Sequence, residues 1–258
     1  MKDDFSPLQQ MLYSGRGIMV GVTPQEEMFV GYTLTGRSPS SQARKLVQGE
    51  ITGVVRTDVT DPEQLKKGSP ALLLYPALIP TTRGPIIAGN GVQTRLIYSA
   101  YENSDGSQDP GQLMFDAFLH PNFEYDSHED RWINTTTYEP DAPNNTPRIS
   151  AFAYQGNVVF HIVRCVHGNP QETVYKFALQ PEHGAFLTTY EGFNENPLLA
   201  FQGEPRNVQI GSTTADALVE TIWDALRGSD SNDYQVSAAV MLQKKAEELE
   251  TRIINRFS

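Results

Sequence analysis

The sequence contains a single cysteine, Cys165, among its 258 residues. One cysteine cannot form an intramolecular disulfide, and it cannot supply a multi-cysteine zinc or iron–sulfur centre. Nothing in the cysteine content indicates an oxidising compartment. We therefore expect a cytoplasmic protein without a cysteine-based cofactor.

Basic residues and long apolar runs are also scarce. Twenty Lys and Arg stand against 31 Asp and Glu, which leaves a net charge of −11. A duplex-binding face would work against this repulsive field, so nucleic acid is not an expected partner. No stretch approaches the ~20 apolar residues that span a bilayer, and residues 1–7 are acidic without an apolar signal core. We expect neither membrane insertion nor secretion.

Short apolar segments rich in Val, Ile, Phe and Tyr extend from Gly17 to about Tyr190, separated by clusters of Gly, Pro, Asn and Asp. This pattern is typical of strands and turns. Both alternating faces of residues 158–167 are largely apolar, which predicts a central strand covered on both sides. The expected strands are 17–22, 28–35, 51–58, 71–79, 85–88, 95–100, 148–154, 158–167, 173–180 and 185–190.

Three segments have helical patterns. Residues 112–119 place their apolar side chains on one stripe, and residues 212–228 begin with N-capping hydroxyls and end at a glycine. Residues 235–257 mix apolar residues with alternating Lys and Glu, which predicts either a packed or oligomer-forming surface helix or a partner-binding segment. The order of elements lacks regular strand–helix alternation and favours a layered α+β domain spanning residues 1–258.

The polar loop 134–148 is the first candidate for a functional site. It combines Glu139, Asp141, Thr146 and Arg148 with three prolines. Prolines restrict the unfolded chain, so such a loop can hold polar groups in fixed positions. The alternatives are a solvated turn, or a simple ion pair between Glu139 and Arg148.

The segment 36–44 is the second candidate, because it sets two arginines among hydroxyl groups. Arg37, Ser38 and Arg44 offer the guanidinium and hydroxyl donors that an anion such as phosphate requires. The same composition also fits an exposed basic loop. Neither a GxGxxG fingerprint nor a Walker phosphate loop occurs.

Two further positions have ordinary explanations beside a functional one. Asn90 and Gly91 form the dipeptide most typical of a hairpin turn, although Asn90 could present an amide at a sheet edge. Tyr75 ends the apolar run 71–75, where a buried core phenol is the default interpretation.

No metal site is expected. His161, Cys165 and His167 share one face of a predicted strand, but at ~3.3 Å per residue the two histidines lie about 20 Å apart and cannot share an ion. Adjacent pairs of these residues could share an ion, but core histidines are the better interpretation. Neither HExxH nor GxSxG occurs in the sequence.

Several of these weak signals together resemble the archaeal-type IMP cyclohydrolase family over about residues 13–206. Two departures from the family are Arg95, where an acidic residue is frequent, and the segment of about 211–258, read here as an extension with two extra helices. The segments that carry the resemblance are Tyr13-Ser14-Gly15-Arg16-Gly17, Gly36-Arg37-Ser38 with Ser41 and Arg44, Asn90-Gly91-Val92-Gln93-Thr94, Tyr138-Glu139-Pro140-Asp141, Thr146-Pro147-Arg148-Ile149 and Thr188-Thr189-Tyr190-Glu191.

The resemblance implies a four-layer α-β-β-α sandwich like that of the N-terminal-nucleophile hydrolases. Lys2 after Met1 offers no N-terminal nucleophile, so the fold alone does not imply an amidohydrolase. The implied reaction is the dehydrative closure of formyl-AICAR to IMP, the last step of purine synthesis. That chemistry requires no metal, redox cofactor or covalent intermediate, only orientation, oxyanion donors and proton movement.

The resemblance also implies roles for individual residues. Arg37 matches the arginine that contacts substrate, and Glu139 matches a loop glutamate that moves a proton or orients the carboxamide. Tyr75 and Asn90 would hydrogen-bond the base and the formyl group. The remaining substrate contacts would come from Arg16, Ser38, Arg44, Thr146, Arg148, Thr189 and Tyr190.

Two other classes of function stay open at this point. A noncatalytic purine-nucleotide-binding protein would retain the pocket without the reaction. An amide-processing enzyme for another nucleotide would use the same fold for different chemistry. The surplus C-terminal segment also suggests a homo-oligomer.

Overall fold

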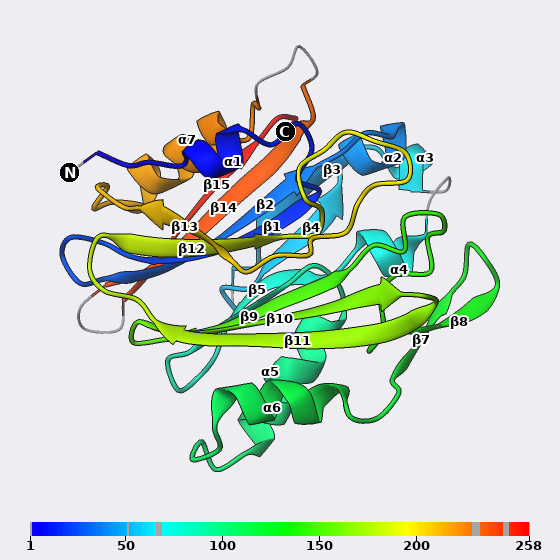
Figure 1. Cartoon of the computed structure of the whole chain (residues 1–258), viewed down its shortest axis with the longest axis horizontal. Helices are drawn as coiled ribbons and strands as arrows, with labels where there is room; N and C mark the ends of the chain where they lie inside the picture. The colour runs from blue at the N-terminus through cyan, green and yellow to red at the C-terminus, as the bar shows by residue number, and fades with distance from the viewer. Residues whose placement is uncertain (1, 51, 66–68, 229–232, 245–247, 258) are drawn as a thin grey trace.

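The computed structural model describes residues 2–50, 52–65, 69–228, 233–244 and 248–257. Two large sheets with mostly antiparallel strands face each other (Figure 1). The six-stranded sheet has the order β13-β12-β1-β2-β14-β15, and the seven-stranded sheet has the order β11-β10-β9-β6-β5-β4-β3. Their strands are β1 (Arg16–Val22), β2 (Met28–Thr35), β3 (Arg44–Gln48), β4 (Val55–Val59), β5 (Pro76–Pro80), β6 (Ile86–Gly89), β9 (Arg148–Tyr154), β10 (Asn157–Val166), β11 (Asn169–Ala178), β12 (His183–Thr188), β13 (Arg206–Gln209), β14 (Gln235–Gln243) and β15 (Leu249–Asn255).

Helices and one small hairpin complete the described chain. The hairpin, β7 (Phe123–Asp126) with β8 (Arg131–Asn134), forms a separate two-stranded sheet. None of the described helices is long and apolar enough to cross a membrane. The helices are α1 (Ser6–Gln9), α2 (Pro39–Gln42), α3 (Pro62–Leu65), α4 (Pro70–Leu73), α5 (Gln93–Asn103), α6 (Pro110–Phe118) and α7 (Ala215–Ala225).

The hydrophobic core lies in three layers. Side chains from both large sheets, such as Leu34 and Phe160, meet in the largest buried cluster. On the outer face of the six-stranded sheet, α1 and α7 bury residues such as Ile222, and α5 and α6 cover the seven-stranded sheet with residues such as Met114. The predicted α+β class is therefore confirmed, and the structure shows that the sheets are mostly antiparallel.

Most predicted strands and two predicted helices are present. β10 is buried along most of its length, as its two apolar faces predict. Helix α7 is capped at its N-terminus by Thr214, whose hydroxyl accepts a hydrogen bond from the backbone N–H of Ala217. Helix α6 is capped at its N-terminus by Asp109, whose carboxylate accepts hydrogen bonds from two backbone N–H groups.

The predicted helix 235–257 is wrong. Its described residues form the hairpin β14–β15, and residues 245–247 lie outside the described part of the chain. β14 is a central strand between β2 and β15, with eight of its nine residues buried. A strand covered on both faces has no polar alternation, so its apolar pattern resembles that of a helix.

Three smaller predictions also need correction. The predicted strand 95–100 belongs to α5, whose residues Thr94, Ile97 and Tyr101 are buried at helical spacing. The predicted strand 71–79 divides into α4 and β5, and 51–58 becomes the shorter β4, with residue 51 outside the described residues. Asn90 and Gly91 connect a strand to a helix and do not form a hairpin. β3, β7, β8 and β13 were not predicted.

Candidate functional site

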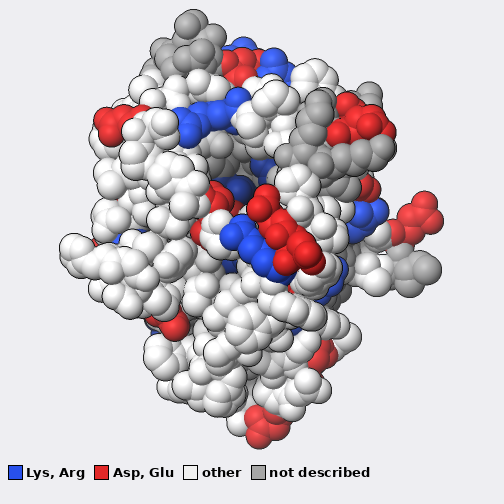
Figure 2. Space-filling view, turned by 90° about the vertical axis from the view of Figure 1, so that its right-hand side faces the viewer, with Lys and Arg blue, Asp and Glu red and all other residues white. Residues whose placement is uncertain are grey.

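The predicted site residues gather at one end of the two large sheets. β1 begins there at Arg16 and β9 at Arg148, whereas β2 ends there at Thr35 and β6 at Gly89. Antiparallel pairing brings these strand ends together. This end of the molecule is hollowed, and basic and acidic side chains lie at the base of the hollow (Figure 2).

An ion-pair cluster of three residues occupies this end. Oε1 of Glu139 lies 2.6 Å from Nη2 of Arg16 and 3.5 Å from Nη1 of Arg148. The three side chains are 3%, 12% and 1% exposed, respectively. Ion pairs this poorly solvated are screened little by salt. The ion pair between Glu139 and Arg148, which the sequence offered as an alternative, is therefore present, but Arg16 is the nearer partner of Glu139.

Burial and neighbouring charges act differently on the two arginines. For Arg16, burial disfavours the charged form, but Glu139 and three nearby tyrosines raise its pKa well above the ordinary value. For Arg148, burial outweighs the attraction of Glu139, and the positive charge of Arg16 adds to it, so its pKa is lowered. Two guanidinium groups thus share one carboxylate.

Asn90 organises the backbone beside Arg148. Its Oδ1 accepts hydrogen bonds from the N–H of Ile149 at 2.8 Å and from Nε2 of Gln93 at 2.9 Å, and its Nδ2 donates to the carbonyl of Pro147 at 2.8 Å. Gln93 Oε1 in turn accepts from Nη1 of Arg148 at 3.4 Å. Asn90 therefore holds the start of β9 in place, and Gln93 is a site residue that sequence reasoning did not single out.

Tyr75 reaches the site from the seven-stranded sheet. Its hydroxyl shares a hydrogen bond of 3.0 Å with the hydroxyl of Tyr32 on β2, and both rings are buried in the core between the sheets. Burial, followed by the neighbouring Tyr75, raises the pKa of Tyr32 well above its ordinary value. Tyr32 was not predicted, since no sequence pattern links two tyrosines 43 positions apart.

Arg44 supplies a third buried guanidinium group. It is 2% exposed, and its Nε donates to the carbonyl of Ser41 at 3.0 Å. Its charge acts on Tyr13 and Tyr32, the same tyrosines that Arg16 influences. No carboxylate among the described residues lies within ion-pair distance of Arg44.

Several buried donors at this end have no protein partner. Such atoms are costly unless a ligand or water satisfies them. The polar atoms without a hydrogen-bond partner within the described structure include Nε of Arg16, Oγ1 of Thr33, Nη1 of Arg44 and Nη2 of Arg148. Their common chemistry is that of donors to an anion or to a carbonyl oxygen.

Arg37 and Ser38 lie farther out. Nη1 of Arg37 donates to Oδ1 of Asn194 at 3.1 Å and to the carbonyl of Glu195 at 3.0 Å, and its guanidinium group stacks over Tyr13. Ser38 caps α2 in a reciprocal capping box with Ser41. The structure thus places Arg37 at the rim of the site and gives Ser38 a local role in the loop.

Thr146, Thr189 and Tyr190 form the remaining wall. The Thr146 hydroxyl lies 2.6 Å from the Tyr190 hydroxyl and donates to Asp141. Oγ1 of Thr189 accepts from the backbone N–H of Arg16 at 3.1 Å, which fixes the start of β1. The structure therefore brings together all the predicted residues except Ser38 and the outlying Arg37.

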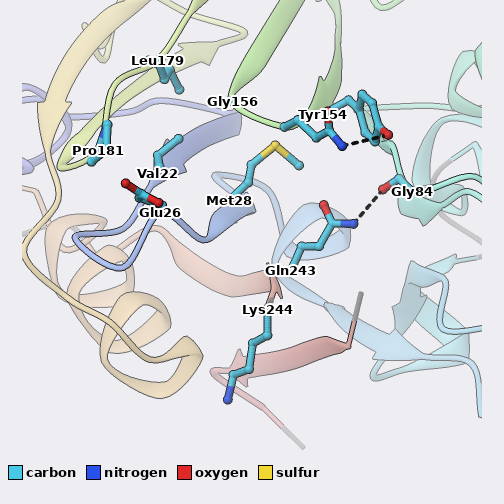
Figure 3. Close-up of a pocket in the computed structure, with 11 residues that line it drawn as sticks. Val22, Glu26, Met28, Gly84, Tyr154, Gly156, Leu179, Pro181, Gln243 and Lys244 are labelled. Carbon is cyan, nitrogen blue, oxygen red and sulfur yellow. Dashed lines mark hydrogen bonds between the residues drawn. The ribbon is translucent and has the colours of Figure 1, made fainter. Parts of the chain in front are cut away.

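Other chemistry-bearing positions lie elsewhere. His161 is buried, contacts the ring of Phe118 and pairs with Glu172 at 3.1 Å. Among the described residues, no group of three or more His, Cys, Asp or Glu is placed to hold a metal ion. A cavity of about 530 Å³, lined by Met28 and Gln243 among others, opens at the opposite end of the sheets (Figure 3) and contains no predicted site residue.

Comparison with known proteins identifies the family of the chain. Residues 13–247 match the family model described as IMP cyclohydrolase-like protein. The match continues past residue 206, where the sequence resemblance ended, and includes α7 and β14. No curated protein matches the chain.

Proposed function

The chain belongs to the IMP cyclohydrolase-like family, and we propose that it closes the ring of formyl-AICAR to give IMP and water. In this reaction the carboxamide nitrogen attacks the formyl carbon of the same molecule. We extend the proposal to the fold: two facing sheets with helices on each outer face are consistent with the four-layer sandwich of the N-terminal-nucleophile hydrolases.

The observation that carries the proposal is the excess of buried positive charge at one end of an acidic chain. Arg16 and Arg148 both pair with Glu139, and Arg44 lies buried at the same end without a carboxylate partner among the described residues. Within the described structure each of the three arginines retains a donor without a partner. In a chain of net charge −11, such a cluster favours an anionic ligand strongly over the surrounding surface. A nucleoside monophosphate with a carboxamide has both the charge and the oxygen acceptors.

Each residue has a defined place in the proposed mechanism. Arg37 at the rim and Arg44 behind it bind the phosphate. Unpaired donors of Arg16 and Arg148 stabilise the oxyanion that develops on the formyl oxygen. Glu139, fixed by two ion pairs, accepts a hydrogen bond from an N–H of the carboxamide and orients the nitrogen for attack. It takes the proton that this nitrogen loses and delivers it to the formyl oxygen, which leaves as water with the proton of the formamido nitrogen.

The proposed pocket is completed by Tyr75, Asn90 and the two residues that follow β12, Thr189 and Tyr190. Tyr75 and Tyr32 present a coupled pair of hydroxyls toward the reacting groups. Asn90 acts mainly through the backbone of β9, because Oδ1 and Nδ2 already bond to protein. The proposed chemistry uses no metal or cofactor, and a cytoplasmic location follows as part of the same proposal.

The test is to mix the purified protein with formyl-AICAR in the presence of a chelator and to follow IMP by absorbance and chromatography. The Glu139→Gln variant should lower turnover by about 10²–10⁴, the usual effect of losing one group of this kind. Glu204→Gln, which changes an exposed glutamate, is the matched control. Wild-type turnover in Glu139→Gln would remove this residue from the mechanism.

Binding without conversion is the outcome that distinguishes a nucleotide-binding protein. A ligand that binds only the folded state raises the melting temperature. If IMP stabilises the protein but formyl-AICAR is not converted, the chain is a binding protein or an enzyme for another nucleotide.

A further inference from the structure

The loop 134–148, which carries Glu139, carries a second carboxylate, Asp141, in a different environment. Asp141 accepts a hydrogen bond from the backbone N–H of Thr146 at 2.7 Å and another from the Thr146 hydroxyl. Among the described residues, no arginine or lysine lies within ion-pair distance of Asp141. Glu139 is therefore a fixed charge held by two guanidinium groups, whereas Asp141 is held only by neutral donors.

Asp141 is the end of a chain of hydroxyl groups that leads into the site. The Thr146 hydroxyl also contacts the Tyr190 hydroxyl, at 2.6 Å. Tyr190 stacks on Tyr13 with ring centroids 5.8 Å apart and lies near enough to Arg16 for each group to shift the pKa of the other. The order of the chain is Asp141, Thr146, Tyr190 and then the substrate space beside Arg16.

The protonation of Asp141 fixes the direction of every hydrogen bond in this chain. Each hydroxyl has one proton to donate. When Asp141 is ionised, Thr146 donates to it and must accept from Tyr190, so the Tyr190 oxygen offers only lone pairs to the site. When Asp141 is protonated, it can donate to Thr146, Thr146 can donate to Tyr190, and Tyr190 can donate into the site.

We propose that Asp141 is a positioning residue that sets, through Thr146, whether Tyr190 accepts or donates a hydrogen bond at the reacting carboxamide. The inference rests on the proposed ring closure. The ionised form is the productive one, because a Tyr190 oxygen that accepts an N–H holds the carboxamide nitrogen in place beside Glu139. The protonated form places a second donor against that N–H and disfavours the attacking geometry.

The surrounding charges set the pH range in which this occurs. Burial, followed by the charge of Glu139 on the same loop, raises the pKa of Asp141 to about 6, against the opposing effects of the Thr146 hydrogen bonds and of Arg16 on β1. Arg148 on β9 also interacts with Asp141, and Tyr190 follows β12. The carboxyl group therefore changes protonation within the range where a cytoplasmic enzyme is assayed.

The experiment compares pH profiles of turnover for wild type, Asp141→Asn, Thr146→Val and Thr146→Ser. Wild-type turnover should fall about tenfold between pH 7 and pH 5, as expected for one group that ionises near pH 6. Asp141→Asn, whose amide donates to Thr146 permanently, should be about tenfold slower at pH 7 and flat over the same range. Thr146→Val should also be flat, and Thr146→Ser should retain the wild-type profile.

A binding measurement separates this inference from the proposed reaction. The affinity for IMP is measured over the same pH range, and the ratio of wild-type to Asp141→Asn affinity is used because the ionisation of the phosphate is common to both. A ratio that changes about fivefold or more between pH 5 and pH 7 supports the positioning role even if no ring closure is found. An acidic fall that persists in Asp141→Asn, or a constant affinity ratio, overturns it.

Discussion

Arg148 shows how closely individual residues of the site depend on one another. Its Nη1 faces Gln93 and Glu139, its Nε donates to the carbonyl of Thr137 at 3.3 Å, and its Nη2 remains without a partner in the described structure. The guanidinium group is thus fixed from the protein side, with one donor left for a ligand. A displacement of this group should affect binding and turnover more than folding.

Gly91→Ala tests that dependence without touching a charged residue. The new Cβ would lie 2.0 Å from Nη1 of Arg148 and 2.5 Å from Oε1 of Gln93, so both side chains would have to move. We expect turnover to fall by about 10²-fold, the cost of a misplacement near 1 Å, with a small change in melting temperature. Gly203→Ala, whose Cβ would meet no atom closer than 3.9 Å, is the control. Unchanged turnover in Gly91→Ala would show that Arg148 does not act in the reaction.

Sequence reasoning found the charged residues of the site more readily than their neutral partners. Arg16, Glu139 and Arg148 were singled out from their motifs, and the structure joins them in one cluster. Tyr32 and Thr33 were not, because each is an ordinary residue of a buried strand. Their importance arises only when β2 is brought opposite the seven-stranded sheet, and no local pattern encodes that contact.

At the level of elements, the C-terminal hairpin is the main failure of sequence reasoning. The charges that suggested a solvated helix face instead pair at one end of the hairpin and with α7. Lys244 lies 2.7 Å from Glu250, and Arg252 lies 2.6 Å from Glu250 and 2.7 Å from Asp216. The same alternating Lys and Glu residues that fit a solvated helix face therefore fit cross-strand and helix–strand ion pairs equally well. Only the position of β14 inside the sheet distinguishes the hairpin from a surface helix for this segment.

The last strand also fastens the two sheets together at one edge. Asn255 of β15 accepts from the backbone N–H of Leu46 on β3 at 2.9 Å through Oδ1, and donates to the Leu46 carbonyl at 3.0 Å through Nδ2. Ser237 on β14 donates to the same Oδ1. The Asn255 side chain thus bonds to the backbone of β3 as a neighbouring strand would, and it links strands of different sheets.

Asn255→Ala should therefore destabilise the protein although the residue lies near the C-terminus. The change leaves the Leu46 backbone groups without these partners, and we expect a loss of about 1–3 kcal/mol in the free energy of unfolding. Urea unfolding measures it, with Asn157→Ala as the control, since within the described part of the chain that exposed side chain makes one hydrogen bond, of 3.4 Å, to the carbonyl of Gln155. Equal stability of the two variants would mean that β15 does not bridge the sheets.

At the scale of the whole molecule, the two sheets share a core and concentrate the unsatisfied polar groups at one end. Burying three arginines and two carboxyl groups at the edge of an apolar core is costly unless the charges are paired. The pairing is incomplete, because Asp141 has no cationic partner within ion-pair distance among the described residues. Its stability should consequently depend on pH in a way that the exposed acidic surface alone does not produce.

Asp141 makes a contribution of defined sign to that dependence. Its pKa rises from 3.8 to about 6 on folding, so the folded state binds more protons than the unfolded state between these values. Stability contributed by this group is complete below pH 3.8 and is lost as the pH rises through 6. The shift corresponds to at most about 3 kcal/mol.

We expect Asp141→Asn to gain stability relative to wild type by up to this amount between pH 4 and pH 7, measured by urea unfolding at each pH. Asp224→Asn, which removes an exposed carboxylate from α7, is the matched control. A stability difference between Asp141→Asn and wild type that does not change with pH would show that the Asp141 carboxyl is not buried with its proton.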